Sequence, residues 1–313
     1  MGRWDVFNRD NGRDTAAGLP REHRREESCA ASVSVGRGPT ESTSAESPER
    51  ADRTQQRSPA QASERRSQHC DRARTYSLRG SEIATMTDLG RFRTLDFRDL
   101  ARFVYGGNET RLKHDLEGLR IQGLIEEKTF FRAHKTPRRL LTLTEQGHRM
   151  IRKIIGSSPQ KMYYGFVKPK EFDHDADLYN VYQKASEEIR ERGGKPTRVR
   201  LDFELKELIN RAKQTAGRLP EDERQRFLSA VANEHGLSID GTTIHLPDVQ
   251  IEYESRDGSI ERQNLELLSR NYREQGIRGK AAAGFKLYAR SGDTNRVRRA
   301  LHDTGMVQEV LSV

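Results

Sequence analysis

Cysteine is scarce in this chain of 313 residues, and long apolar runs are absent from it. The two cysteines, Cys29 and Cys70, are too few for a disulfide framework, which favours a reducing compartment such as the cytoplasm. No run approaches the roughly 18 apolar residues of a membrane-spanning helix, and the first residues lack the pattern of a secretory signal. We therefore expect a cytoplasmic protein with no membrane partner. The sequence contains no glycine-rich phosphate loop of the kind that would indicate a nucleotide hydrolase.

Hydrophobic residues are also few, at 33% of the chain, and the first part has almost none at regular spacing. Residues 1–74 contain 14 Arg and 12 Asp and Glu but no Lys. Such a mixed-charge sequence cannot bury enough apolar surface to offset the entropy lost on ordering. We predict a disordered segment over residues 1–75. A nucleic-acid-binding tail and an over-extended gene model are the alternative interpretations.

Two short helices joined by a turn are predicted between Thr94 and Gly123. Apolar residues at helical spacing, from Phe97 to Val104, predict the first helix, and two glycines follow it. Asn108 can cap the second helix, whose leucines face inward and whose basic residues remain for solvent or a ligand. A further helix, with a buried stripe of apolar residues, is predicted before this pair at 77–89.

A hairpin with a basic tip is predicted next, from strand-like residues 124–131 and 140–143 joined by residues 134–139. Together with the two helices it resembles the winged helix-turn-helix of bacterial DNA-binding regulators. In that arrangement a helix enters the major groove and the hairpin reaches the flanking backbone. Residues 79–155 contain 16 Lys and Arg against 10 Asp and Glu, an excess of 6 within the chain's net +9. The resemblance implies contacts to double-stranded DNA by Arg111, Lys113, His114, Arg120, Lys135, Arg138 and Arg139.

Several features leave more than one interpretation open. The winged helix can serve protein contacts alone. The helix from 145 to 155 either pairs protomers in a homodimer or covers the back of the winged helix. The aromatic, basic connector 161–172 either grips single-stranded nucleic acid or ties two domains together. The helix that follows starts with Asp173, His174, Asp175 and Asp177. These four residues either bind a metal, or the three acids among them are simply favoured by the positive end of the helix dipole.

A second site is predicted around Asp248, in a region of alternating strands at 238–246, 249–254 and 260–268. Asp248 in a turn and Glu266 on a strand can share one Mg²⁺ ion, which prefers carboxylate oxygens and retained waters. Helix, strand, hairpin, helix and strand in this order resemble the PD-(D/E)xK nuclease core. The motif's lysine, two residues after Glu266, is replaced by Leu268. Lys280 or Lys286 can supply the missing charge, and Glu187 can supply a further acid.

The whole of residues 77–313 resembles the replication-relaxation family of bacterial and plasmid-borne DNA-binding proteins. The resemblance rests on the domain order, on Pro247-Asp248 with Glu266, and on the segment from Asn271 to Phe285. It implies an α/β (α+β) fold with a winged helix-turn-helix domain at 76–156, a linker at 157–172 and a nuclease-like domain at 173–313.

Three functions follow from these patterns. We expect a DNA-binding protein in replication, mobilisation or regulation of a bacterial or plasmid element, with an inactive nuclease-like domain, because the lost lysine weakens stabilisation of a transferring phosphate. The first alternative is a Mg²⁺-dependent DNA endonuclease whose catalytic residues are Asp248, Glu266 and Lys280. The second alternative is a transcriptional regulator whose second domain senses a small molecule.

Overall fold

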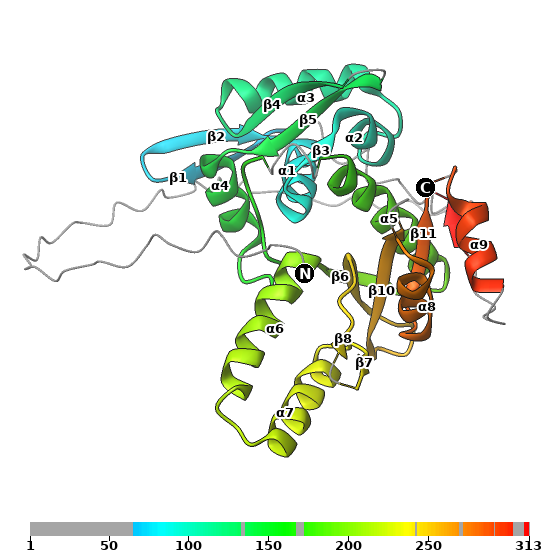
Figure 1. The fold of residues 1–313 in the computed structure, drawn as a ribbon. Helices are drawn as coiled ribbons and strands as arrows, with labels where there is room; N and C mark the ends of the chain where they lie inside the picture. The colour runs from blue at the N-terminus through cyan, green and yellow to red at the C-terminus, as the bar shows by residue number, and fades with distance from the viewer. Residues whose placement is uncertain are drawn as a thin grey trace, which may run out of the picture. The chain divides into compact units, whose positions relative to one another are not determined.

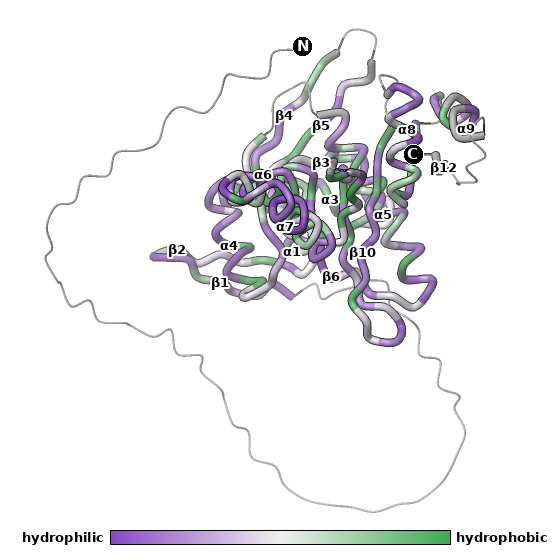
Figure 2. Tube along the Cα trace, turned by 60° about the horizontal axis from the view of Figure 1, so that its bottom comes forward, coloured by the Kyte–Doolittle hydropathy of each residue, from purple (hydrophilic) through white to green (hydrophobic). Residues whose placement is uncertain are grey.

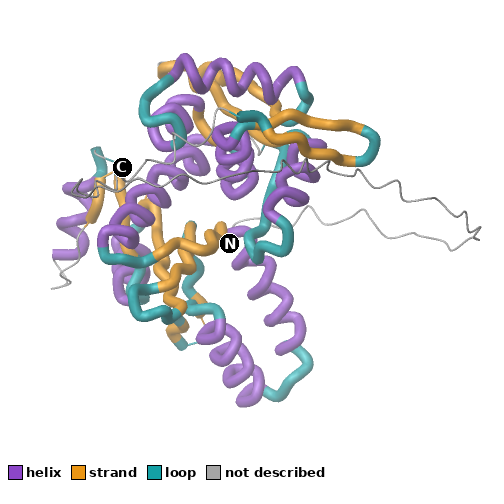
Figure 3. The backbone as a smooth tube through the Cα atoms, turned by 180° about the vertical axis from the view of Figure 1, so that it is seen from behind, coloured by secondary structure: helices purple, strands orange, loops and turns teal. Residues whose placement is uncertain are grey.

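The first described element is a hairpin that the sequence patterns did not predict. The computed structural model describes residues 65–132, 135–166, 172–241, 243–268, 272–290, 292–302 and 310–312. Residues 1–64, most of the segment predicted to be disordered, lie outside the described residues. The rest of that segment forms antiparallel strands β1 (Ser67–Asp71) and β2 (Arg74–Leu78), joined by a short turn (Figure 3). The predicted boundary at residue 75 therefore falls inside a strand.

Polar contacts attach this hairpin to later parts of the chain. The side-chain amide of Gln122 donates to the carbonyl of Ser77 at 3.2 Å and accepts from its N–H at 3.0 Å. Gln146 donates to the hydroxyl of Tyr76 at 2.5 Å, and the side chains of Tyr76 and Leu78 are buried. A strand pair with few apolar residues is thus fixed by partners about 45 and 70 positions away in the sequence.

The elements from residue 80 to 155 follow the order predicted for a winged helix-turn-helix. The strands pair antiparallel in the order β3-β5-β4. Gly106 and Gly107, with φ of +59° and +88°, form the turn between the second and third helices in a backbone conformation that favours glycine. The elements are α1 (Gly80–Phe92), β3 (Leu95–Asp96), α2 (Phe97–Phe103), α3 (Glu109–Ile121), β4 (Ile125–Arg132), β5 (Lys135–Leu143) and α4 (Glu145–Ile155).

A five-stranded mixed sheet follows, in the order β12-β11-β10-β9-β6. Strands β6, β9 and β10 pair antiparallel, whereas β10, β11 and β12 pair parallel. Helix α8 connects β10 to β11, because a parallel pair needs a crossover. The sheet and its helices comprise α5 (Phe172–Glu191), β6 (Lys195–Leu201), β9 (Val249–Glu254), β10 (Ile260–Leu268), α8 (Glu274–Ala282), β11 (Lys286–Ala289), α9 (Thr294–His302) and β12 (Val310–Ser312).

An insertion separates β6 from β9. Helices α6 (Asp202–Ala216) and α7 (Glu221–Glu234) form a helical hairpin that extends away from the sheet (Figure 1). Helix α7 is hydrophilic over much of its length (Figure 2), and the hairpin has a small core of its own. The strand predicted at 238–246 is instead two short strands, β7 (Ile239–Asp240) and β8 (Thr243–Ile244).

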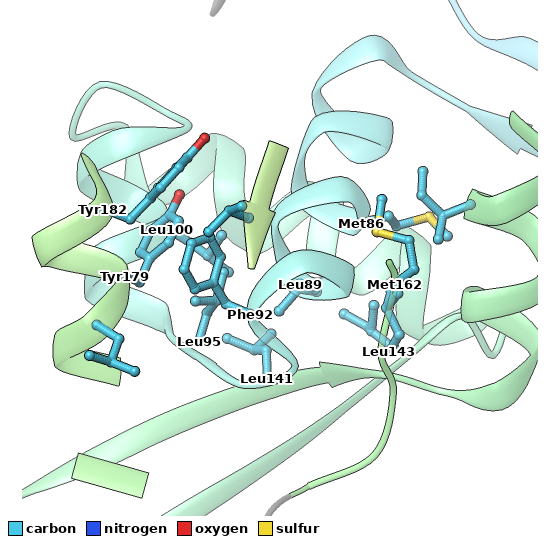
Figure 4. Packing of buried hydrophobic residues seen from close by; sticks show 14 of the residues in the cluster. Met86, Leu89, Phe92, Leu95, Leu100, Leu141, Leu143, Met162, Tyr179 and Tyr182 are labelled. Carbon is cyan, nitrogen blue, oxygen red and sulfur yellow. The ribbon is translucent and has the colours of Figure 1, made fainter. Parts of the chain in front are cut away.

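Helix α5 connects the winged-helix elements to the sheet through one buried core. The rings of Tyr179 and Tyr182 lie 5.1 and 4.9 Å from the ring of Phe92 on α1 (Figure 4). The Tyr179 hydroxyl donates to Asp88 at 2.6 Å. Buried side chains of α5, β6, β9 and β10 belong to the same cluster as those of α1, α3 and β5. The two predicted domains therefore share apolar packing.

The described part of the predicted linker is also fixed by contacts. The side chain of Gln160 donates to the carbonyl of Val199 at 3.0 Å and accepts from its N–H at 2.8 Å, at the edge strand β6. The N–H of Tyr163 donates to the carbonyl of Gly90 at 2.7 Å, and Met162 is buried. These contacts favour the interpretation of the connector as a strap between the winged-helix elements and the sheet.

Candidate nucleic-acid interface and acidic site

Helix α3 is held by a buried leucine face and by its cap. Leu112, Leu116 and Leu119 are buried at helical spacing, which turns the basic residues between them outward. The side chain of Asn108 accepts from the N–H of Arg111 at 3.0 Å, the capping bond that the sequence predicted. The helix therefore has a defined start beside the glycine turn.

A buried carboxylate locks the first turns of α3 against α1. Asp115 is fully buried and accepts from Arg79 at 2.8 Å, from Ser81 at 2.5 Å and from Tyr105 at 3.1 Å. Burial raises the pKa of Tyr105, and the nearby charge of Asp115 adds to that shift, so the phenol remains a donor. Arg79 was not predicted as a functional residue, because its partner lies 36 positions away in the sequence.

The predicted basic residues of α3 lie at the surface. The exposed fractions of the Lys113, His114 and Arg120 side chains are 57%, 62% and 62%. His114 lies 3.0 Å from Arg79, and Arg120 pairs with Glu117 of the same helix at 2.8 Å. A groove beside the start of α3 is lined by Arg79, Asn108, Thr110, Arg111 and His114.

The predicted wing residues differ from one another. Arg138 is directed toward the body of the protein, where its Nε donates to Asp96 at 2.8 Å and its side chain is 27% exposed. Arg139 is 40% exposed, pairs with Glu127 at 2.7 Å and lies over the Phe97 ring, 4.2 Å from its centroid. The side chain of Lys135 lies outside the part of the chain that the structure describes. The predicted DNA contact of Arg138 stays a prediction, and in this structure its guanidinium is held by Asp96.

The two predicted acids of the second site meet at neighbouring strand ends. Asp248 immediately precedes β9, and Glu266 lies on β10, which pairs with β9 so that Leu265 faces Val249. The backbone N–H of Asp248 donates to Glu266 at 3.2 Å, and the Asp248 carboxylate accepts from the N–H of Leu267 at 2.9 Å. The pairing of β9 with β10 thus places Asp248 and Glu266 side by side, as the sequence predicted.

Lys280 reaches this acidic pair from α8. Its Nζ lies 2.9 Å from Oε1 of Glu266 and donates to the carbonyl of Leu246 at 2.5 Å. The Tyr272 hydroxyl also donates to Glu266. Lys286, the other predicted replacement, pairs instead with Glu188. The charge missing at Leu268 is therefore supplied by the following helix, whereas Leu268 itself is buried.

Burial dominates the electrostatics of the pair. Glu266 is 1% exposed, and this burial, reinforced by the charge of Asp248, raises the pKa of Glu266 to about 6, although Lys280 and Tyr272 oppose the shift. His174 on α5 lies 3.5 Å from Asp248. Burial alone would lower the pKa of His174, but the hydrogen bond and charge of Asp248 outweigh it and raise the pKa. Neither Tyr272 nor His174 was predicted to contact the pair.

The donor set is compatible with Mg²⁺ but offers little beyond two carboxylates. Within the described ranges, no three or more His, Cys, Asp or Glu side chains form a group that could hold a metal ion, so Glu187 adds no third ligand. Mg²⁺ commonly uses one or two carboxylates and keeps its waters, which Asp248 and Glu266 can satisfy. At the start of α5, Asp177 pairs with Arg290 at 2.6 Å rather than with this pair.

Comparisons with known proteins do not identify a family for this chain. No protein-family model and no curated protein matches it. A crystal structure of Bacillus subtilis PadR in complex with operator DNA is similar over 49% of this chain and 90% of that chain, at 16% identity and a TM-score of 0.21. A TM-score this low does not establish a shared fold. In the described part of the chain, no helix is long and apolar enough to cross a membrane.

Proposed function

We propose that this protein binds double-stranded DNA through α3 and the β4–β5 hairpin. The observation that best supports this is the groove at the start of α3, where Arg79, Arg111 and His114 gather. The N-terminus of a helix adds backbone N–H groups and the positive end of its dipole, both suited to a phosphate. Lys113 and Arg120 lie further along the exposed face, where a recognition helix contacts base edges.

The ion pairs on this face do not prevent DNA binding. Arg120 and Glu117 are more than half exposed, and solvent screens an exposed pair of this kind, so it contributes little to stability. A phosphate can therefore replace Glu117 as the partner of Arg120. Arg139 at the base of the hairpin adds a partly exposed cation on the same group of elements.

A salt-titrated binding assay tests this proposal. A fluorescent 30-base-pair duplex is titrated with the wild type and with Arg111→Ala/Lys113→Ala at several salt concentrations. We expect weaker binding by the variant and a salt slope lower by about one, because the lost phosphate contact of Arg111 removes roughly one unit. Arg226→Ala, at an exposed position of α7, serves as the matched control. Equal affinity and slope in all three proteins would reject α3 as the interface.

The biological setting follows only from the family resemblance. We propose a role in replication, mobilisation or regulation of a bacterial or plasmid element, with 76–156 as the DNA-binding domain and 173–313 as the nuclease-like domain. The replication-relaxation family, a homodimer and a cytoplasmic location stay predictions.

A Mg²⁺-dependent DNA endonuclease is the second candidate function. The ion pair between Lys280 and Glu266 favours it, because it restores a cation at the acids despite Leu268. Asp248 and Glu266 would hold Mg²⁺, which supplies charge stabilisation at a scissile phosphate when bound. Lys280 would place its ammonium group beside that phosphate, while Tyr272 and His174 would orient the two carboxylates.

Plasmid nicking separates the two candidates. Supercoiled plasmid is incubated with Mg²⁺ or Mn²⁺ and either wild type, Asp248→Ala or Lys280→Met. If the site is active, nicking appears with wild type and disappears in both variants, whereas all three bind duplex equally. Nicking that persists in Asp248→Ala would identify contamination, and no nicking by wild type would leave the protein as a binder alone.

A further inference from the structure

A second groove lies beside the acidic site. It runs between the β7–β8 hairpin and α8, and its lining includes Tyr272 and Lys280, the two side chains that contact Glu266. It has a volume of about 670 Å³ and is formed partly by the insertion between β6 and β9. A ligand that enters this groove would therefore contact the two side chains that hold Glu266, which is itself only 1% exposed.

The lining of the groove carries more basic than acidic side chains. Arg273, Arg278 and Lys280 line it together with His245, against a single acid, Asp240. Glu274, 3.6 Å from Arg278, partly offsets this charge at the surface. The Nε of Arg278 has no hydrogen-bond acceptor among the described residues, and the side chain is 39% exposed. Its guanidinium can therefore donate to an anion that enters the groove.

The floor of the groove is low because two of the α8 residues that line it are glycines. A Cβ added at Gly276 would lie 3.6 Å from the Tyr272 ring, and one added at Gly279 would lie 3.7 Å from the His245 ring. The absence of side chains at these positions lets a ligand backbone approach the helix closely. The rings of Tyr272 and His245 lie beside this floor and belong to the lining of the groove.

We propose that the groove between β7–β8 and α8 binds a single strand of nucleic acid. Cations that follow a backbone, combined with rings for base stacking, are the combination by which proteins bind single strands without sequence preference. The strand's phosphates would lie along Arg273 and Arg278, and one of them would reach Lys280. This rests on the second candidate function, in which the Asp248–Glu266 pair acts on a nucleic acid.

The test is binding of a fluorescent dT20 oligonucleotide in EDTA, so that no metal-dependent cleavage occurs. The full chain is compared with Arg273→Ala/Arg278→Ala, with Arg273→Lys/Arg278→Lys and with the control Arg226→Ala. We expect the alanine variant to bind dT20 roughly tenfold more weakly and the lysine variant to keep most of the affinity. Duplex binding, measured in parallel with a competing excess of dT20, should be equal in all four proteins.

Each outcome has one meaning. Loss of dT20 binding in the alanine variant alone, at an unchanged thermal midpoint, supports the groove. The groove proposal would be overturned by any of three results. These are equal dT20 binding by all four proteins, no dT20 binding by the wild type, and a loss in Arg226→Ala as large as that in the alanine variant. Failure of the duplex-binding proposal would appear separately, as absent duplex binding by the wild type. Failure of the endonuclease candidate would appear as absent nicking, and neither result changes the dT20 comparison.

Discussion

The elements from α1 to α4 and the five-stranded sheet each bury an acid beside a partly buried cation, Arg79 in the first and Lys280 in the second, but only the first also presents exposed cations next to its acid. Around α3 the acid Asp115 is buried among donors, whereas the cations Lys113 and Arg120 are exposed. Around β10 the acid Glu266 is also buried, but its cation Lys280 is turned inward and is only 18% exposed. The first region presents charge to a partner, and the second concentrates charge inside a site.

This difference teaches what each region can do. Exposed cations bind a polyanion with little reorganisation, and their contribution decreases with salt. Buried charged groups interact more strongly, but their protonation is coupled to folding. The first region should therefore respond to ionic strength and the second to pH and divalent cations.

The largest expected effect is a loss of stability on replacing Asp115, the buried acid of the first region. Asp115→Ala leaves three donors around a fully buried site without their acceptor. We expect a loss of about 3 kcal/mol in the free energy of unfolding, because removing one partner of a buried pair leaves the other without compensation. Urea denaturation measures it, with the exposed Glu117→Ala as control. A loss no larger than that of the control would show that the network does not stabilise the fold.

A smaller effect is expected from the titration of Glu266. Its folded pKa of about 6 lies above the ordinary glutamate pKa of 4.5, so the folded state binds the proton more tightly. The associated stability is present below pH 4.5 and is lost as the pH rises through 6, by about 2 kcal/mol in total. Glu266→Gln should flatten this part of the stability curve between pH 4 and 7.

Repeating the measurement of stability against pH in the presence of Mg²⁺ tests for a metal site without any activity assay. If Asp248 and Glu266 bind Mg²⁺, the ion favours the charged carboxylate and should reduce the loss of stability above pH 6 in the wild type. Asp248→Ala provides the control, because it removes one ligand. Identical curves with and without Mg²⁺ would contradict a metal site.

The smallest effect separates the two neighbouring arginines of β5. Arg138→Ala should lower stability by about 1 kcal/mol, because Arg138 is partly buried against Asp96, but should leave the salt slope of duplex binding unchanged. Arg139→Ala should leave stability nearly unchanged and lower that slope by about one. Thermal unfolding and salt-titrated binding measure the two effects. The reverse pattern would return Arg138 to the interface.

Local patterns predicted much of the element order, and also the pairing of the acids. Leucine spacing in α3 and the glycine turn before it are short-range signals, as is the strand alternation around Glu266. The approach of Lys280 was predicted as one of two options, because the resemblance to the nuclease core implied that the basic group can be relocated. Choosing between Lys280 and Lys286 required the structure, since Glu188 of α5 takes the second.

What could not be predicted depends on distant partners. The β1–β2 hairpin has few apolar residues, and its partners Gln122 and Gln146 lie far along the chain. The ion pair of Arg138, a residue of the β4–β5 hairpin, joins it to Asp96, 42 positions earlier, and no local pattern encodes this contact. The core that α5 shares with α1 depends on aromatic packing between segments about 90 residues apart, which no periodicity encodes.

Two glutamine side chains make the same kind of contact, each with both backbone groups of one strand residue. At these residues the strand has no free backbone group for a further strand to pair with. Gln122 pairs with both backbone groups of Ser77 on β2, and Gln160 pairs with both backbone groups of Val199 on β6. A glutamine amide offers one acceptor and a donor side by side, the same pair that an incoming strand would offer. Open strand edges are templates on which other chains can add and polymerise. At these two positions a single side chain already occupies that template, so resistance to self-assembly is built into each edge by one residue.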